Sequence, residues 1–149
     1  MAQTYTQLTY HFVFGSKDRL NLLDEPVTQR LYPFLTAMIN NELGFTRIIG
    51  GMPDHLHILA DLSPKVTVSE VLRDLKGRSS SWLRREFPAL QFSWQEGYGA
   101  FTVSASVIDK VQAYIQNQKQ HHEKQDFRTE FVTLVQRHGL TVDEASLWK

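Results

Sequence analysis

The sequence Asp-His-Leu-His-Ile-Leu-Ala-Asp-Leu at residues 54–62 alternates strictly between two kinds of position. Successive side chains of a β-strand point to opposite faces of a sheet, so the alternation predicts a strand with one face turned to a core. The core face would carry the apolar residues Leu56, Ile58, Ala60 and Leu62. The opposite face would carry His55, His57, Leu59 and Asp61.

The segments before this strand supply its first partners. Residues 45–49 are short and β-branched, and Gly50, Gly51 and Pro53 follow, which predicts a hairpin with residues 54–62. Residues 5–14 show a second alternation, with aromatic and aliphatic side chains on one face and His11 on the other. This pattern predicts a half-buried strand.

Two amphipathic helices are expected between the strands. One begins with the capping residue Asp24 and a proline in its first turn, and Gly44 is its expected end. Pro33 should kink this helix or mark its true start. The second begins at a capping box, Thr67 to Glu70, and ends before Pro88.

The second half of the chain adds further elements. Residues 90–94 are predicted to form a short strand, and residues 100–103 another short extended piece. A third helix should run from Ser104 or Ser106 to about Lys124. A fourth should span residues 127–138 and stop at Gly139.

The order strand, helix, strand, strand, helix, strand matches the split βαβ pattern of ferredoxin-like folds. We therefore expect one α+β domain over residues 1–149. Its antiparallel sheet would carry two helices on one face, and a late helix would cover the face with the two histidines.

Composition narrows the possible functions. The chain has 149 residues, 42% of them hydrophobic, and no cysteine, which excludes disulfides, iron–sulfur clusters and thiol nucleophiles. The formal net charge is zero, which argues against holding long duplex DNA by bulk charge. No apolar run is long enough to span a bilayer and no signal peptide is recognisable, so a soluble cytoplasmic protein is the default expectation.

His55 and His57 are the first candidates for chemistry. Two residues apart on a strand, they point the same way and lie about 6–7 Å apart, so their rings could converge on one cation. The alternative is a pair of exposed strand histidines with no ligand.

Tyr114 and Gln118 are the second candidates. They are four residues apart on one helix face, and His121 and His122 follow. A tyrosine is a poor nucleophile at its ordinary pKa near 10, but a nearby metal ion could stabilise its phenolate, and Gln118 could offer that ion a neutral oxygen. The alternative is packing, because Tyr114 also belongs to an apolar stripe.

A basic, serine-rich segment of the second helix is the third candidate. Residues 65–86 contain six basic and three acidic residues, and small hydroxyl and basic side chains suit a phosphate backbone. The candidate DNA contacts are Lys76, Arg78, Ser79, Ser80 and Arg84. A solvated helix face is the alternative. The segment is neither a P-loop nor a serine-nucleophile elbow.

Taken together, these motifs resemble the HUH single-tyrosine transposases of the insertion-sequence-200-like family, which includes the REP-associated tyrosine transposases. The similar stretches lie in the same order over nearly the whole chain. They are residues 11–19, 52–58, 75–80, 94–101, 114–122, 131–134, 138–140 and 147–148.

The resemblance implies a transposase that cleaves and rejoins single-stranded DNA at element ends through a 5′-phosphotyrosine. It gives the nucleophile role to Tyr114, and the role of ligands for Mg²⁺ or Mn²⁺ to His55, His57 and Gln118. It also implies DNA ends that form hairpins. Members of the family form homodimers, so we expect sites that take the histidines from one chain and Tyr114 with Gln118 from the other.

Two other functions compete with this one. A metal-dependent hydrolase could use the two histidines with Asp54 or Asp61, and would form no covalent intermediate. An inactive ferredoxin-like module could bind hairpins without cleaving them.

Overall fold

A computed structural model describes residues 2–123 and 125–149, and within them one antiparallel sheet has the order β2-β3-β1-β4. Its strands are β1 (Thr9–Gly15), β2 (Gly44–Met52), β3 (His55–Leu62) and β4 (Gly99–Thr102). All paired strands are antiparallel. This order and the helices between the strands confirm the ferredoxin-like α+β prediction.

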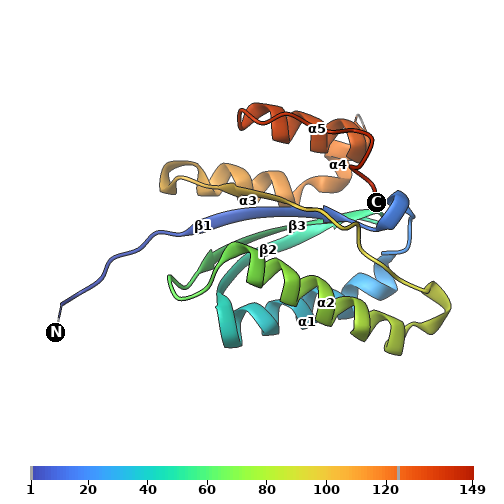
Figure 1. The fold of residues 1–149 in the computed structure, drawn as a ribbon, viewed down its shortest axis with the longest axis horizontal. Coiled ribbons are helices and arrows are strands. Elements are labelled where there is room, and N and C mark those ends of the chain that lie inside the picture. The colour runs from blue at the N-terminus through green and yellow to red at the C-terminus, as the bar shows by residue number, and fades with distance from the viewer. Residues whose placement is uncertain (1, 124) are drawn as a thin grey trace.

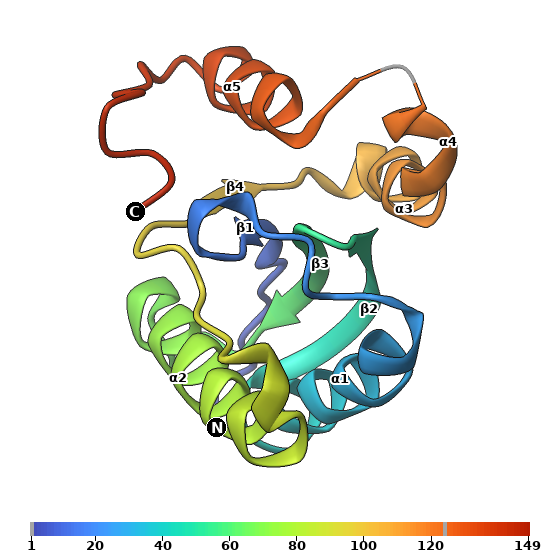
Figure 2. The same cartoon turned by 90° about the vertical axis from the view of Figure 1, so that its right-hand side faces the viewer.

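The helices lie on both faces of this sheet (Figures 1 and 2). On one face lie α1 (Glu25–Met38) and α2 (Val68–Glu86). On the other lie α3 (Ile108–Gln116), α4 (Gln118–His122) and α5 (Phe127–Arg137). The expected late cover over the histidine face is therefore present, built from three helices.

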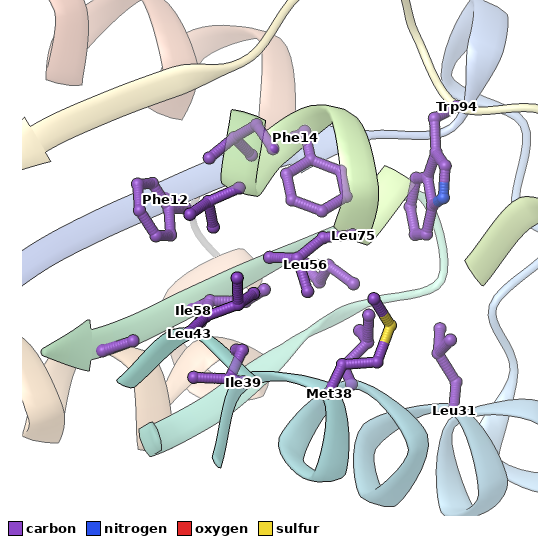
Figure 3. Close-up of a cluster of buried hydrophobic side chains, with 14 of the residues drawn as sticks. Phe12, Phe14, Leu31, Met38, Ile39, Leu43, Leu56, Ile58, Leu75 and Trp94 are labelled. Carbon is purple, nitrogen blue, oxygen red and sulfur yellow. The ribbon is translucent and has the colours of Figure 1, made fainter. Parts of the chain in front are cut away.

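The face toward α1 and α2 carries the main hydrophobic core (Figure 3). Phe12 and Phe14 of β1 and Leu56 and Ile58 of β3 are fully buried there, as the alternation predicts. The core closes with Trp94, whose ring meets Phe14 edge-on with 4.8 Å between centroids. Because these side chains of β1 and β3 are buried on one face of the sheet, the residues that alternate with them point to the opposite face.

The opposite face has two smaller apolar clusters. Leu59 of β3 packs with a residue that directly follows β4 and with residues of α3, including Ile115. Val13 of β1 packs with Phe127 and Phe131 of α5. In the β1–β3 register Val13 pairs with His57 and Gly15 with His55, so the histidines lie between these clusters.

The helix boundaries follow the capping chemistry read from the sequence. Asp24 accepts a hydrogen bond from the Val27 amide, and Thr67 accepts one from the Glu70 amide. Gly139, with φ of 76°, follows α5. The first helix runs through Pro33 instead of starting there, and a π-helical turn, Ile39–Leu43, carries it to Gly44.

Two extended segments differ from expectation. The first strand begins at Thr9, and residues 2–8 leave the sheet (Figure 1). Residues 90–94 form no named strand, because Gln91 takes a left-handed φ of 48° and Trp94 makes a single bridge to Ser16. The last sheet strand is instead β4, which overlaps the second extended piece and begins one residue before it.

The third helix is also interrupted. A 3-10 turn, Ala105–Val107, precedes α3, and Asn117 leaves helical geometry with φ of −98° and ψ of 25°. Asparagine is a weak helix former, which fits a break between α3 and α4. The expected end near Lys124 lies outside the described residues.

Within residues 2–123 and 125–149, no helix has both the length and the apolar character needed to cross a bilayer.

Two glycines give a matched test of this packing. A Cβ on Gly50 of β2 would lie 2.7 Å from the Ile115 carbonyl oxygen of α3, whereas one on Gly77 of α2 would have nothing within 4 Å. We expect Gly50→Ala to lower the free energy of unfolding by about 1–3 kcal/mol through overpacking. Gly77→Ala should raise it by about 0.5–1 kcal/mol. Urea unfolding measures both, and equal effects would contradict the close α3–β2 approach.

Candidate active site

His55 and His57 lie side by side on β3 and are fully buried. They are thus not the exposed pair considered as an alternative. The ring centroids are 5.1 Å apart, and α4 and α5 lie over them. Burial of two imidazoles with no polar partner would be costly, so their partners define the site.

Tyr114 and Gln118 come from the covering helices of the same chain. Gln118, at the start of α4, is 2% exposed, and its Oε1 lies 3.0 Å from His55 Nε2. The Tyr114 ring meets His57 edge-on with centroids 5.7 Å apart. The four residues singled out in the sequence therefore lie together within one chain.

Glu130 of α5 is a central residue that the sequence analysis missed. Its side chain is buried, and its Oε1 lies 3.1 Å from His55 Nε2, 3.2 Å from His57 Nε2 and 3.0 Å from His122 Nε2. Its Oε2 accepts hydrogen bonds from the Tyr114 hydroxyl and from Gln118 Nε2. One carboxylate thus joins side chains from β3, α3 and α4.

A sequence signal for Glu130 existed. It lies three residues after Phe127 and one before Phe131, both of which face the sheet from α5. An acidic residue on the apolar face of an amphipathic helix is rare unless a polar partner in the fold contacts its side chain. The signal is weak without knowledge of what that face meets.

Further polar contacts orient the two strand histidines. His55 Nδ1 lies 2.7 Å from Asp54 Oδ1, and His57 Nδ1 lies 2.8 Å from His11 Nε2. Phe127 stacks flat on the His55 ring, with 3.9 Å between centroids. In both histidines the Nε2 atom therefore faces the cluster and the Nδ1 atom is held from behind.

Burial and charge set the protonation of the cluster. Burial raises the pKa of Tyr114, and the Glu130 carboxylate adds to the shift. Burial lowers the pKa of His57 to about 4. Burial would raise the pKa of Glu130, but its hydrogen bonds to His122, His55 and His57 hold it well below its usual range. At neutral pH the site holds a neutral phenol beside an ionised carboxylate.

The cluster has the donor chemistry of a divalent-metal site. One ligand atom each from His55, His122 and Glu130 lie within 4.8 Å of one another. Imidazole nitrogen with carboxylate and amide oxygen suits first-row ions such as Mn²⁺ better than Mg²⁺. Buried ligand atoms turned toward one point are what such an ion requires.

The carboxylates of the rival hydrolase do not join this cluster. Asp61 forms an ion pair with Arg47 at 2.8 Å, and along β3 it lies about 13 Å from His57 at the usual strand rise. Asp54 contacts His55 only at Nδ1, the nitrogen behind the ring. Among the described residues, neither carboxylate contacts the Nε2 atoms of the two strand histidines, which point toward Glu130.

The candidate DNA contacts lie on α2, across the sheet from the cluster (Figure 2). Ser79 is fully buried and accepts a hydrogen bond from Trp94 Nε1, while Ser80 bonds the Gly77 carbonyl. Lys76 donates to the carbonyls of Glu96 and Gly97. Arg78 and Arg84 are exposed and bind Glu42 and the Phe92 carbonyl. The structure does not bring these five residues to the cluster.

The residues that the family resemblance singles out, His55, His57, Tyr114 and Gln118, lie together beside this ferredoxin-like sheet. The family model described as "Transposase IS200 like" matches residues 4–118. The chain therefore belongs to the IS200-like transposase family, and its function is that of a transposase, a DNA-processing enzyme.

Individual relatives agree with the family. The chain is 31% identical to the IS200 transposase of Salmonella typhimurium over an alignment of 126 residues, with coverage of 79% of this chain and 81% of that protein. It is 27% identical to the ISDra2 transposase of Deinococcus radiodurans, over 80% of this chain and 87% of that protein.

Solved structures support the fold. A candidate transposase from Deinococcus radiodurans superposes with a TM-score of 0.65 at 26% identity, covering 79% of this chain and 96% of that one. A REP-associated tyrosine transposase bound to a REP hairpin superposes with a TM-score of 0.61 at 15% identity, covering 82% and 73%. The second likeness concerns the fold alone.

Phe127 offers a test of how α5 is held over the histidines. It is 1% exposed, whereas Phe45 of β2 is 59% exposed. We expect Phe127→Ala to lower the free energy of unfolding by about 3–5 kcal/mol and to speed amide hydrogen exchange in α5. Phe45→Ala should change it by less than about 0.5 kcal/mol. Unchanged α5 exchange in Phe127→Ala would show that the helix is held by other contacts.

Proposed function

We propose that this transposase cleaves and rejoins single-stranded DNA at element ends, with Tyr114 as the nucleophile, a 5′-phosphotyrosine as the intermediate, and metal assistance. The observation that carries the proposal is the position of the Tyr114 hydroxyl. It reaches the same buried carboxylate on which His55 and His57 converge, although α3 and β3 are far apart in the chain.

The chemistry balances without an energy source. As Tyr114 Oη bonds to the phosphorus, the bond from phosphorus to the 3′ oxygen breaks. The phenol loses one proton and the departing 3′ hydroxyl gains one. One phosphodiester replaces another, so a second 3′ hydroxyl can reverse the step on a different strand.

Activation of the phenol is the main barrier. Burial and Glu130 raise the pKa of Tyr114, so the phenolate is scarce near neutral pH. A divalent ion held by His55, His57 and Gln118 would stabilise the phenolate and withdraw charge from the phosphate. His11 and Asp54 hold the two rings in place for this task.

A cavity beside Tyr114 gives DNA a route to the site. Its volume is about 300 Å³, and it lies among residues of α3, α5 and β4. Lys110 and Arg137 line it, and such cations favour a phosphate backbone. A flexible single strand can bend into a cavity of this kind, whereas a rigid duplex cannot.

The proposed partners are DNA ends that form hairpins with single-stranded flanks. A related structure holds a REP hairpin, which supports this choice for the present chain. The exposed Arg78 and Arg84 of α2 remain candidate contacts for such a hairpin, far from the cut. With zero net charge, recognition depends on local contacts.

Tyr114→Phe tests the nucleophile directly. The ring volume is kept and only the hydroxyl is lost, so we expect folding and hairpin binding to persist and cleavage to disappear. A denaturing gel of labelled single-stranded substrate measures the covalent protein–DNA adduct, and wild-type protein on blunt duplex DNA is the second negative lane. Adduct formed by Tyr114→Phe would overturn the assignment.

The shared site implied by the family resemblance is the second part of the proposal. In the described chain α3 and α4 lie on their own sheet, and the chain end is tied there too, since Leu147 and Trp148 carbonyls accept hydrogen bonds from Gln95 Nε2 and the Asp18 amide. We propose a homodimer that exchanges α3 and α4, so that each site takes His55 and His57 from one chain and Tyr114 with Gln118 from the other. Such an exchange would repeat the same contacts between subunits.

Mixing two inactive variants separates these arrangements. If each chain builds its own site, Tyr114→Phe mixed with His57→Ala stays inactive, because every site keeps one defect. If subunits share sites, each mixed dimer has one intact site and cleavage returns. Subunit exchange is verified with two affinity tags, and persistent inactivity after verified exchange would overturn the shared site.

A further inference from the structure

Glu130 and His122 lie beyond residues 4–118, the part of the chain that matches the family, yet both reach the centre of the cluster. We propose that Glu130 Oε1 is itself a ligand of the divalent ion, together with His122 Nε2, and that Glu130 Oε2 positions Tyr114 beside that ion. The inference rests on the proposed function and adds two ligands to its metal site.

The first support is the set of polar groups around His55. Its Nδ1 faces the Asp54 carboxylate, which can only accept. Gln118 donates from its amide nitrogen to Glu130, so its oxygen is the atom turned to His55 Nε2. His55 Nε2 therefore faces two oxygens, from Gln118 and Glu130. A metal-ligating histidine typically has this arrangement, with a carboxylate behind Nδ1 and with Nε2 turned toward the ion and its other ligands.

The second support is the geometry around Glu130 Oε1. Nε2 atoms of His55, His57 and His122 lie 3.1, 3.2 and 3.0 Å from this one oxygen. Ligands about 2.1 Å from an octahedral ion lie about 3.0 Å from their neighbours. Each nitrogen thus lies at the distance from Glu130 Oε1 that is expected of an adjacent ligand, and the ligand atoms of His55, His122 and Glu130 lie within 4.8 Å of one another. Gln118 Oε1, also 3.0 Å from His55 Nε2, fits as a further ligand.

The third support is charge. Histidines and an amide carry no negative charge to offset a buried dication, whereas Glu130 brings one and is 1% exposed. A site with three imidazoles and one carboxylate favours Mn²⁺ over Mg²⁺, which prefers oxygen ligands and retains water. The ligand set therefore points to Mn²⁺ as the tighter ion.

The two carboxylate oxygens of Glu130 have different partners. Oε1 faces the imidazoles, and Oε2 accepts hydrogen bonds from the Tyr114 hydroxyl and Gln118 Nε2. A ligand oxygen and the oxygen that holds the nucleophile thus belong to one planar group. This places the phenol next to the ion without making it a ligand, so Glu130 acts on Tyr114 as a positioning residue.

The test is Mn²⁺ affinity of the full-length protein, measured by calorimetry and by the electron paramagnetic resonance signal of free Mn²⁺, without DNA. Glu130→Gln keeps the shape and removes the charge. We expect it to weaken Mn²⁺ binding at least about tenfold, with His122→Ala in the same range. Glu144→Gln is the matched control, because Glu144 is exposed and pairs with Arg128. It should bind as wild type does.

Two further variants separate the possible failures. His57→Ala should lose Mn²⁺ binding, and if it and the wild type bind equally, the metal site of the proposed function is wrong. If His57→Ala loses binding while a folded Glu130→Gln binds as wild type does, Glu130 is not a ligand. Tyr114→Phe should keep wild-type affinity, and a large loss would contradict the separation of phenol and ion.

The positioning role has its own readout. With Mn²⁺ and DNA both saturating, Glu130→Gln should still lower the rate constant of covalent adduct formation at least about tenfold, because the phenol has lost its charged acceptor. An unchanged rate constant at saturation would restrict Glu130 to metal binding and overturn the second half of the inference. Circular dichroism and thermal unfolding verify that each variant is folded.

Discussion

An ionised carboxylate inside a protein costs several kcal/mol unless polar groups replace the water that it loses. Glu130 is buried, and its replacements come from β3, α3 and α4: histidine nitrogens on one oxygen, Tyr114 and Gln118 on the other. The packing of α5 over the sheet and the orientation of Tyr114 therefore both depend on the contacts of the charged Glu130 side chain. If any partner is removed, the carboxylate is left undersolvated, which makes the cluster cooperative.

Strand β3 could be understood from the sequence alone because its period of two serves both faces. Leu56 and Ile58 had to face a core, so His55 and His57 had to face away from it, and the structure confirms both statements. The helix caps at Asp24 and Thr67 depend only on residues close in sequence, so they could be predicted from the sequence equally well. Local rules fixed the strands and helices that frame the site.

Residues whose role depends on distant partners were harder to predict. Glu130 is one acid on an amphipathic helix, and nothing near it in sequence names the histidines that it meets. Residues 90–94 alternate like a strand, but Phe92 and Trp94 are buried without strand pairing beyond one bridge, since Gln91 turns the backbone. The sequence likewise left the contacts of Tyr114 open, and the structure places its hydroxyl beside Glu130.

The two faces of the sheet differ in content: one carries the main hydrophobic core, and the other carries the histidine cluster. The large core toward α1 and α2 contains no member of the histidine cluster, and α5 is held by smaller apolar contacts around Phe127 and Phe131. A helix held this way can open at lower cost than the core can unfold, and elements that must admit a substrate are drawn from such regions. Phe127 lies flat on His55, so opening α5 would uncover a ring of the site and withdraw Glu130 together. Under the proposed function, access of DNA to Tyr114 and the integrity of the proposed ligand set are therefore coupled through α5.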